Sequence, residues 1–339
     1  MASKSDDNGR PKLSDIAKAA GVSVSTVSKV INGRPDIGAQ TRELVEKTMN
    51  DFGYQKSLVR TQPINLIEVV FQEFQTMWAM ELLKGVTQVA SANGISVTVT
   101  ELGDQPPASD SWTHDILERR PIGVILVFSD LSSEVRQRFQ SRNIPFLTLD
   151  PAGDPAPETI CVRADNWTGE LIATRHLITL GHRRIGIITG PLNMLCARAR
   201  YDGFTAAMAE AGIEVDPKLV RSGRFEVENG YELGDSLLSS ENPPTAIIAG
   251  NDLQALGVYD AARKRHISIP DDLSIIGFDN ISISQHISPA LTTITQPLTD
   301  MARRAAEILL SQHTGQPTPN NTVFPTTLVV RESTAPPRK

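Results

Sequence analysis

The stretch Leu13–Ile31, LSDIAKAAGVSVSTVSKVI, decides the fold of the N-terminal part of the chain. Its apolar residues recur at helical spacing on both sides of Gly21, a residue that readily adopts the left-handed backbone of a tight turn. Ser23 is a good N-cap for the second of these helices. A third helix is expected from about Ala39 to Phe52, with four residues facing inward: Leu44, Val45, Met49 and Phe52. Two short helices around a glycine turn, covered by a third helix, predict a helix-turn-helix unit.

The second helix of such a unit lies in the major groove of DNA, and its first residues meet the edges of the bases. In this sequence those positions hold short hydroxyl side chains, one β-branched apolar side chain and, one turn later, a cation: Ser23, Val24, Ser25, Thr26 and Lys29. Hydroxyl and ammonium groups reach the polar edges of bases, and Val24 suits the methyl group of thymine. A small helical module that binds another protein is the alternative interpretation of the same three helices.

Length and composition exclude several classes of protein. The chain has 339 residues, of which 40% are hydrophobic and 21% charged, so it is long enough for two or three domains. It has no apolar run of about 18 residues, and its first residues, MASKSDDNGRPK, lack the apolar segment of a secretory signal. Two cysteines, Cys161 and Cys196, are too few for a disulfide framework. We therefore expect a cytoplasmic protein with no membrane partner.

Charge is distributed unevenly along the chain. Residues 1–60 contain ten Lys or Arg and seven Asp or Glu, a balance of +3. Because the whole chain has a net charge of −6, the remaining residues carry −9. A basic N-terminal part on an acidic body predicts that binding to a polyanion is confined to that N-terminal part.

Beyond residue 63, short apolar runs alternate with longer helical segments. The predicted strands are 64–71, 95–99, 123–128, 145–149, 184–189, 246–249 and 273–278. The predicted helices are 77–93, 132–141, 167–180, 197–211, 227–240 and 252–264. Continuous apolar strands separated by helices predict parallel sheets covered on both faces, and this length exceeds one such sheet. We expect an α/β core of two doubly wound parallel sheets with a cleft between them.

Polar residues follow the predicted strands, where ligands bind in such folds. They are Asp130, Asp150, Asp165, Asn166, Asn251, Asp252, Asp279 and Asn280. Many residues of this kind serve as helix N-caps or turn residues. Together with Arg200, however, the group predicts a surface that binds hydroxyl groups. Trp78, Trp167 and Phe225 lie beside the same cleft and suit the apolar face of a sugar ring, although each ring alone fits ordinary packing.

An enzyme finds little support in the sequence. No GxGxxG, GxxxxGK[ST], GxSxG, HExxH or CxxC motif occurs, so we expect no catalytic residue, no metal site and no cofactor. Cys196 near Arg198 and Arg200 is a candidate activated thiol, but it has no evident base partner. A sugar-binding protein without a DNA function is a further alternative, which the N-terminal helices oppose.

The chain resembles the lactose repressor family of bacterial transcription regulators (LacI/GalR type) over residues 12–335. The resemblance begins in LSDIAKAAGVSVSTVSKVINGRPDIGAQTRELVEKTMNDFGY. It continues in the family's order through TRHLITLGHRRIGIITGP, ARARYDGFTAAM, AGNDLQALGVYDAA, DLSIIGFDN and PALTTITQPLTDM. The resemblance implies a three-helix helix-turn-helix domain at 12–56, a short hinge at 57–63 and a two-lobed core like a periplasmic binding protein at 64–334. Lobe 1 is expected at about 64–162 and 294–322, and lobe 2 at about 163–291 and 323–334, with disordered tails at 1–11 and 335–339.

The resemblance also assigns individual residues to two sites. Base-reading positions fall on Val24, Ser25 and Lys29, and backbone-contacting positions on Ser14, Ser23, Thr26, Ser28, Asn32 and Thr41. Effector-binding positions fall on Arg200, Asn251, Asp279 and Phe225, and also on Trp78 and Asp165. Trp167 joins this set from the cleft argument above.

Two departures from the family pattern stand out. The family usually has Thr or Ser before the first helix, whereas this chain has Lys12, so that N-cap is expected to be lost or shifted toward Ser14. The hinge is short, and Leu58 is the candidate wedge for the DNA minor groove. Pro63 limits any hinge helix to about one and a half turns.

The expected function is that of a homodimeric repressor of sugar or oligosaccharide utilisation genes. It binds a near-palindromic operator, and a small molecule between the lobes alters its affinity for that DNA. A purine-responsive or sugar-phosphate-responsive regulator of the same fold is the alternative. Whether the effector releases or recruits DNA binding stays open.

Overall fold

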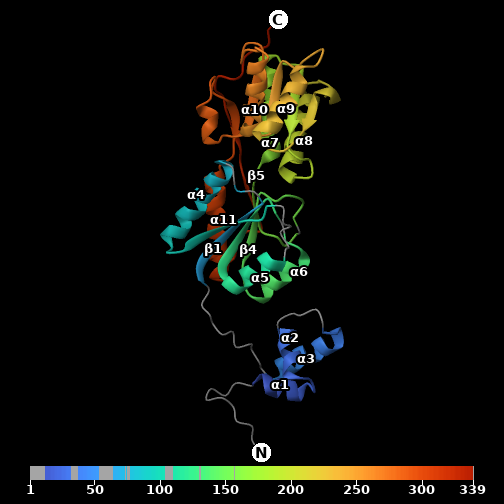
Figure 1. Cartoon of the computed structure of the whole chain (residues 1–339), viewed down its shortest axis with the longest axis vertical. Helices are drawn as coiled ribbons and strands as arrows, with labels where there is room; N and C mark the ends of the chain where they lie inside the picture. The colour runs from blue at the N-terminus through green and yellow to red at the C-terminus, as the bar shows by residue number, and fades with distance from the viewer. Residues whose placement is uncertain are drawn as a thin grey trace, which may run out of the picture.

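The computed structural model describes residues 12–31, 37–52, 64–72, 74, 77–103, 110–129, 131–155 and 157–338. Three short helices form the N-terminal unit (Figure 1): α1 (Leu13–Ala19), α2 (Val24–Ile31) and α3 (Ala39–Asp51). Their apolar faces meet in a small core of Ile16, Ala17, Ala20, Val27, Val30 and Val45. The predicted three-helix unit is therefore confirmed.

The ends of these helices follow mostly from local residues. Gly21 has a φ of +65°, in the left-handed region, and Ser23 caps α2 through a hydrogen bond from a first-turn N–H at 3.1 Å. The first helix begins after Lys12, whose own N–H donates to the Asp15 carboxylate at 2.9 Å. The expected shift of this N-cap toward Ser14 does not occur, because Asp15 holds the start of the helix.

Two residues predicted to lie on the buried face of the third helix are exposed instead. Leu44 and Phe52, expected to face inward, are 49% and 46% exposed. The buried side of α3 carries Val45, with Met49 packed beside it, and Leu44 lies about 100° around the helix from Val45. Phe52 follows the last helical residue, Asp51, and so leaves the helical spacing. That part of the prediction is wrong.

The first lobe of the core contains a six-stranded parallel sheet in the order β11-β5-β4-β3-β1-β2. Its strands are β1 (Ile64–Phe71), β2 (Ser96–Glu101), β3 (Pro121–Val127), β4 (Phe146–Leu149), β5 (Cys161–Ala164) and β11 (Asn321–Phe324). One face packs against α4 (Met77–Ala92) and α11 (Leu298–His313), and the other against α5 (Asp110–Arg119) and α6 (Ser133–Ser141).

The second lobe repeats this plan, with the strand order β12-β10-β9-β8-β6-β7. Its strands are β6 (Ile185–Thr189), β7 (Val220–Ser222), β8 (Ala246–Ala249), β9 (Ser274–Asp279), β10 (Thr292–Thr295) and β12 (Thr327–Val329). Helices α7 (Asn166–Leu180) and α8 (Leu195–Glu210) cover one face, and α9 (Val227–Leu238) and α10 (Asp252–Lys264) the other. The edge strand β12 runs antiparallel to β10, so the two predicted doubly wound sheets are confirmed with one antiparallel edge.

The chain passes between the lobes after β5, after β10 and between β11 and β12 (Figure 1). The predicted limits of the lobes, at residues 162, 291 and 322, come a few residues before these crossings. Strands from both ends of the core sequence therefore share each sheet. Within the described ranges, no helix combines the length and the apolar character needed to span a membrane.

The C-terminal residues pack on the second lobe, which corrects the expectation of a disordered tail from residue 335. Ala335 donates its N–H to Ser274 Oγ at 3.0 Å, and its carbonyl accepts a hydrogen bond from the buried ring of His182 at 2.9 Å. Arg338 forms an ion pair with Asp272. The C-terminal segment is ordered by hydrogen bonds to buried residues of the second lobe. The composition of the segment alone does not predict these partners.

Candidate functional site

The exposed start of α2 gathers the residues predicted to read DNA. Ser23, Val24 and Ser25 are exposed, and Val24, although apolar, leaves 48% of its surface open. The Ser23 hydroxyl lies 2.7 Å from that of Ser25 and 2.8 Å from that of Thr26. Lys29 is exposed one turn later. An apolar group, a hydroxyl cluster and a cation on one end of a helix make a surface suited to the edges of bases.

The other predicted DNA contacts are only partly described. Ser14 is exposed, whereas Ser28 and Thr41 are half-buried. Asn32 and Leu58 lie outside the described residues, as do the predicted hinge at 57–63 and the N-terminal tail at 1–11. Those assignments stay predictions.

A cavity of about 370 Å³ lies between the two lobes of the core. The first lobe lines it with the ends of β1 and β3 and the start of α4, and the second lobe with α8 and the ends of β8 and β9. Trp78 and Phe128 stack with their ring centroids 4.7 Å apart, and Phe225 contributes a third ring from the second lobe. The cavity thus lies beyond the carboxyl ends of parallel strands, where doubly wound folds bind ligands.

Most of the side chains predicted for effector binding line this cavity: Trp78, Arg200, Phe225, Asn251 and Asp279. Asp165 and Trp167 do not belong to its lining. The Asp165 carboxylate instead caps α7 by accepting the Thr168 N–H at 3.1 Å, and Trp167 is 42% exposed. Both residues lie at the start of α7, whose buried side faces α8, so the structure does not bring them to the cavity.

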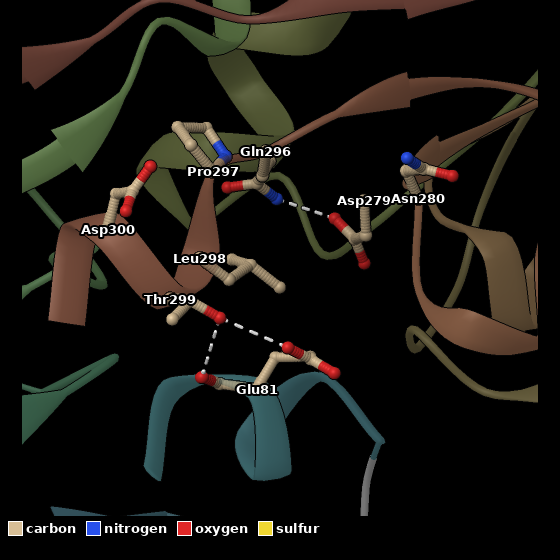
Figure 2. A pocket seen from close by; sticks show the side chains of 8 residues that line it. All are labelled: Glu81, Asp279, Asn280, Gln296, Pro297, Leu298, Thr299 and Asp300. Atoms are coloured by element: carbon tan, nitrogen blue, oxygen red, sulfur yellow. Dashed lines mark hydrogen bonds between the residues drawn. The ribbon is translucent and has the colours of Figure 1, made fainter. Parts of the chain in front are cut away.

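A smaller cavity of about 170 Å³ also has Asp279 in its lining (Figure 2). Its lining comes from α4, the end of β9 and the start of α11: Glu81, Asp279, Asn280, Gln296, Pro297, Leu298, Thr299 and Asp300. Asp279 therefore lines both cavities. The sequence analysis did not anticipate this second space.

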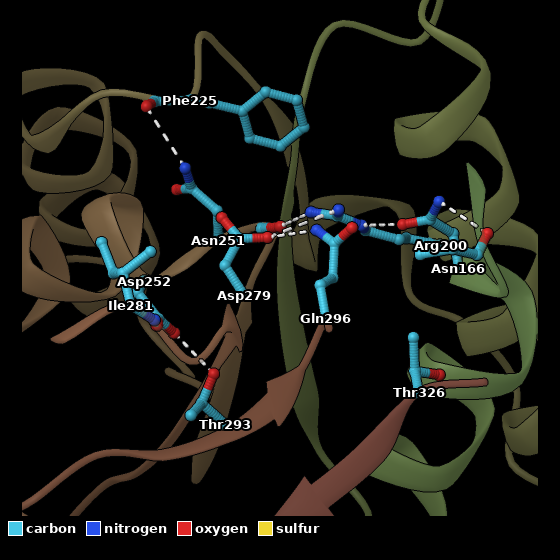
Figure 3. A network of polar contacts seen from close by, with 12 residues as sticks. Asn166, Arg200, Phe225, Asn251, Asp252, Asp279, Ile281, Thr293, Gln296 and Thr326 are labelled. Atoms are coloured by element: carbon cyan, nitrogen blue, oxygen red, sulfur yellow. Dashed lines mark hydrogen bonds and ion pairs between the residues drawn. The ribbon is translucent and has the colours of Figure 1, made fainter. Parts of the chain in front are cut away.

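Arg200 is the centre of a polar network at the floor of the larger cavity (Figure 3). Its Nε donates to Asn166 Oδ1 at 2.8 Å, one terminal nitrogen donates to the Gly250 carbonyl, and the other lies 3.6 Å from Asp279 Oδ1. The guanidinium also stacks on the Phe278 ring, 3.7 Å from its centroid. A guanidinium held in this way is ready to offer its remaining N–H groups to a ligand.

Three buried carboxyl groups lie near this guanidinium. Burial raises the pKa of Asp150 to about 6, of Glu170 to about 8 and of Asp279 to about 6, in each case against the lowering effect of Arg200. Among the described residues, neither carboxyl oxygen of Glu170 has a hydrogen-bond partner. Glu170 lies where α7 crosses α8 closely, since a Cβ atom at Gly203 would lie 2.3 Å from the backbone of α7. With its pKa raised to about 8, Glu170 is mostly protonated at pH 7.

Replacing Glu170 by glutamine is expected to remove a loss of stability at alkaline pH. The folded-state pKa of Glu170 is raised to about 8, above the ordinary value. Between these two pH values the folded protein binds one proton more than the unfolded protein. Below the ordinary pKa this group costs no stability, because it is protonated in both the folded and the unfolded protein. As pH rises through about 8, the unfolded protein has already released this proton, and the free energy of unfolding falls. Wild type and Glu170→Gln should melt alike at pH 5, whereas at pH 8.5 the variant should melt higher by roughly 5 °C or more.

Differential scanning fluorimetry across pH measures this difference. The exposed Glu232 on α9 supplies the matched control, because Glu232→Gln should keep the wild-type pH profile. Parallel profiles for wild type and Glu170→Gln would contradict the assignment of a buried, neutral Glu170.

Cys196 lines the larger cavity but is not an activated thiol. Burial, with the neighbouring carboxyl groups of Asp150 and Asp279, raises its pKa to about 12. The thiolate is the nucleophilic form of cysteine, so this thiol is inert at neutral pH. The hypothesis that Arg198 and Arg200 activate Cys196 is wrong, because desolvation outweighs the charge of Arg200, and Arg198 forms a surface ion pair instead.

Backbone strain marks the ends of the strands that border the cavities. Phe128, Asp150, Asp279 and Asn280 have φ values of +51°, +51°, +109° and +55°. Residues other than glycine rarely adopt such values, at a cost of about 1–3 kcal/mol each. Two of these strained residues, Phe128 and Asp279, line the larger cavity. The fold thus tolerates strain where it directs a ring and a carboxyl group toward the ligand space.

The structure adds residues that the sequence analysis did not assign to the site. Phe128 stacks on Trp78, and the Gln296 side chain donates to Asp279 Oδ1 at 2.5 Å. Gln296 lies within the quoted stretch PALTTITQPLTDM, so a closer reading of that motif could have found it. Glu170 gave no signal, because a glutamate on a predicted helix is ordinarily exposed.

Comparison with known proteins agrees with this architecture. The family profile described as "Bacterial regulatory proteins, lacI family" matches residues 12–57, and that of a periplasmic binding protein-like domain matches residues 174–334. The transcriptional repressor PurR of Haemophilus influenzae (strain PittEE) is 34% identical over 307 residues, covering 89% of this chain and 91% of the relative. The transcriptional regulator DegA of Bacillus subtilis (strain 168) is 34% identical over 331 residues, covering 95% and 97%.

Solved structures give the same result. The complex of the transcriptional regulator CelR with cellobiose is similar with a TM-score of 0.74 and 30% identity, over 96% of this chain and all of that one. The lac repressor dimer bound to operator and the anti-inducer ONPF is similar with a TM-score of 0.70 and 27% identity, over 96% and 99%.

A helix-turn-helix unit joined to a two-lobed core with a cavity between its lobes defines a ligand-responsive transcription regulator. The extent of the similarity makes the assignment specific. The chain belongs to the lacI family of bacterial regulatory proteins.

Proposed function

We propose that this protein is a cytoplasmic, homodimeric repressor of sugar or oligosaccharide utilisation genes, whose effector binds in the larger cavity. One observation carries the proposal. Arg200, Asn251 and Asp279 meet at the floor of a cavity whose opposite wall is the stacked pair Trp78 and Phe128. A sugar ring has hydroxyl groups around its rim and an apolar face. The polar groups of this cavity suit the hydroxyl groups, and its aromatic rings suit the apolar face. The similarity to a regulator solved with cellobiose supports the same class of effector.

The polar groups of the cavity suit vicinal hydroxyls in particular. Arg200 donates, the ionised Asp279 accepts, and the Asn251 amide can do both. Asn251 is held in place because its Oδ1 caps α10 at 2.8 Å from the Gln254 N–H and its Nδ2 donates to the Phe225 carbonyl at 3.3 Å. A preorganised mixture of donors and acceptors recognises a neutral polyol without a net charge on the ligand.

DNA binding is assigned to the exposed start of α2. Val24, Ser25 and Lys29 read bases in the two half-sites of a near-palindromic operator, and contacts to phosphates supply most of the affinity. Effector binding favours one closure state of the lobes and thereby changes the affinity of the two N-terminal units for DNA, which is a coupling free energy between sites.

A thermal-shift screen of the purified protein tests the effector class. Mono- and oligosaccharides, sugar phosphates and purines are each added to the same preparation. A ligand at a hundred times its Kd stabilises the folded state by about 2.7 kcal/mol, which is readily measured as a higher Tm. A response to sugars supports the proposal, and a response confined to other compounds contradicts it.

A purine is the second candidate effector. The three rings Trp78, Phe128 and Phe225 would suit a flat heterocycle, and several similar regulators carry the name PurR. The same screen distinguishes the two candidates, because guanine and hypoxanthine are included beside the sugars.

A further inference from the structure

We propose that the smaller cavity beside Asp279 is a second subsite for the effector and takes a neutral, hydroxyl-rich unit such as the second ring of an oligosaccharide. The inference rests on the proposed function, because it extends the site in which the effector binds. The subsite specifies the size of the effector and the chemical groups that the effector carries.

The two cavities are neighbours, because they share the lining residue Asp279. The first turns of α4 contribute Trp78 to the larger and Glu81 to the smaller. Residues three apart on a helix share a face, so these two side chains lie on the same face of α4. The smaller cavity, about 170 Å³, has the volume of several water molecules. A ligand that passes Asp279 would therefore occupy both spaces.

Gln296 supplies a buried hydrogen-bonding group that lacks a partner. The residue is 4% exposed and lines the smaller cavity, and its Oε1 finds no donor among the described residues. Its Nε2 donates to Asp279 Oδ1, and Figure 2 shows the amide oxygen on the side away from that carboxylate. An ionised carboxylate only accepts, so Gln296 must turn its amino group toward Asp279 and offer its oxygen elsewhere. A ligand hydroxyl would complete that bond.

The start of α11 brings backbone N–H groups to the smaller cavity. Its first turn, Leu298 to Asp300, lines the cavity, and the N-cap residue Pro297 makes no side-chain cap. The Leu298 N–H donates to the Gln296 carbonyl at 2.8 Å, which leaves the N–H groups of Thr299 and Asp300 with no acceptor within their own helix. The cavity therefore presents donors from the backbone together with acceptors from side chains.

The charges around the cavity favour a neutral ligand. Glu81 lies 3.7 Å from Lys84, and Asp300 lies 2.8 Å from Arg303, so each carboxylate is matched on its own helix. An anion attracted to the helix start would meet these carboxylates and Asp279. Among the described residues, no group of three His, Cys, Asp or Glu side chains is placed to hold a metal ion. Hydroxyl groups, which both donate and accept, satisfy this mixed lining.

Variants that alter only the smaller cavity test the proposal. Thr299→Met places a longer side chain in it, and Glu81→Met removes an acceptor from the opposite wall, where Glu81 Oε2 accepts from Thr299 Oγ1 at 3.1 Å (Figure 2). Thr314→Met, at the far end of α11, is the matched control because Thr314 lines neither cavity. The melting curve of each unliganded variant confirms that it folds, and Glu81→Met, which is partly exposed, remains informative if Thr299→Met does not fold.

Isothermal titration with glucose, cellobiose, maltose, galactose and lactose gives the measurement. A disaccharide should bind wild type at least tenfold more tightly than its component monosaccharide. Thr299→Met and Glu81→Met should lose most of that gain while their affinity for the monosaccharide changes less than twofold, and Thr314→Met should match wild type. Unchanged disaccharide affinity in both cavity variants would overturn the subsite and leave the proposed function standing. A response to purines alone would overturn the proposed function and the subsite together.

Discussion

Lys29→Ala is expected to weaken binding to the specific operator by about a thousandfold while leaving effector binding unchanged. A good base contact contributes roughly 1–3 kcal/mol, and a dimer makes it twice, so the expected loss is roughly 2–6 kcal/mol. Lys29 is exposed on α2 and lies outside the core of the N-terminal unit, so the variant should fold normally. The proposed effector site lies in a different domain of the chain.

Fluorescence anisotropy at one fixed salt concentration measures this effect. The operator is first selected with the wild-type protein from a library of random duplexes, and an unrelated duplex reports non-specific binding. Lys47→Ala, an exposed lysine on α3, is the control and should retain specific binding much better. An equal loss on both duplexes would make Lys29 a phosphate contact rather than a base contact. Parallel losses of DNA and effector binding would contradict the division of labour between the two domains.

Arg200→Ala should have the opposite consequence: a protein that still binds the operator but no longer responds to its effector. The guanidinium is the fixed donor at the floor of the larger cavity, held by Asn166, Gly250 and the Phe278 ring. Truncation removes every hydrogen bond that it offers to a ligand. Loss of a charged hydrogen bond costs roughly 1.5–3 kcal/mol and exposes further unpaired groups, so affinity should fall at least about tenfold to a hundredfold.

The same substitution should also lower stability, and this effect must be separated from binding. Arg200 lowers the pKa values of Asp150, Glu170 and Asp279, so its removal allows all three to rise further. Breaking a buried ion pair costs roughly 3–5 kcal/mol when the partner stays charged. Because raised carboxyl pKa values cost stability as pH increases, the variant should be least impaired near pH 5 and most impaired above pH 7.

Arg198→Ala is the control for this second prediction. Arg198 lies on the same helix and pairs with Asp154 at the surface, with 44% of its side chain exposed. Its removal should change neither the Tm nor the effector response appreciably. Release of operator DNA by the effector is then compared in the three proteins at a pH where all are folded. A normal response in Arg200→Ala would place the effector outside the larger cavity.

Local sequence signals determined most of the elements of this protein. The spacing of apolar residues around Gly21 predicted the helix-turn-helix unit, and the alternation of apolar runs with helical segments predicted two parallel sheets. Several predicted bounds coincide with the observed ones, as for β1 (Ile64–Phe71) and α10 (Asp252–Lys264). Such signals are readable because a helix or a strand repeats its buried face every few residues. The predicted elements lack the strands β5, β7, β10, β11 and β12, whose three or four residues do not establish a period, and they also lack the helices α5 and α11.

The composition of the site was only partly determined in this way. Asp165 and Asp279 both follow or end a strand, yet the first caps α7 and the second lines two cavities. Nothing in their local sequence separates these roles, because Asp is favoured both as a helix cap and at strand ends. The family resemblance correctly placed Arg200, Asn251 and Asp279 together. It also assigned Asp165 to the same site, although Asp165 does not line the cavity.

Only the tertiary structure decided the chemistry of the groups around Arg200. Burial between α7 and α8 makes Glu170 a neutral acid, and burial beside carboxyl groups makes Cys196 inert. The smaller cavity, the packed C-terminal residues and the exposure of Leu44 likewise depend on which surfaces meet. A sequence by itself determines helices and strands, because their buried residues repeat along one segment. Desolvation, hydrogen-bond partners and cavities arise between segments far apart in the chain, and for that reason they were decided by the fold.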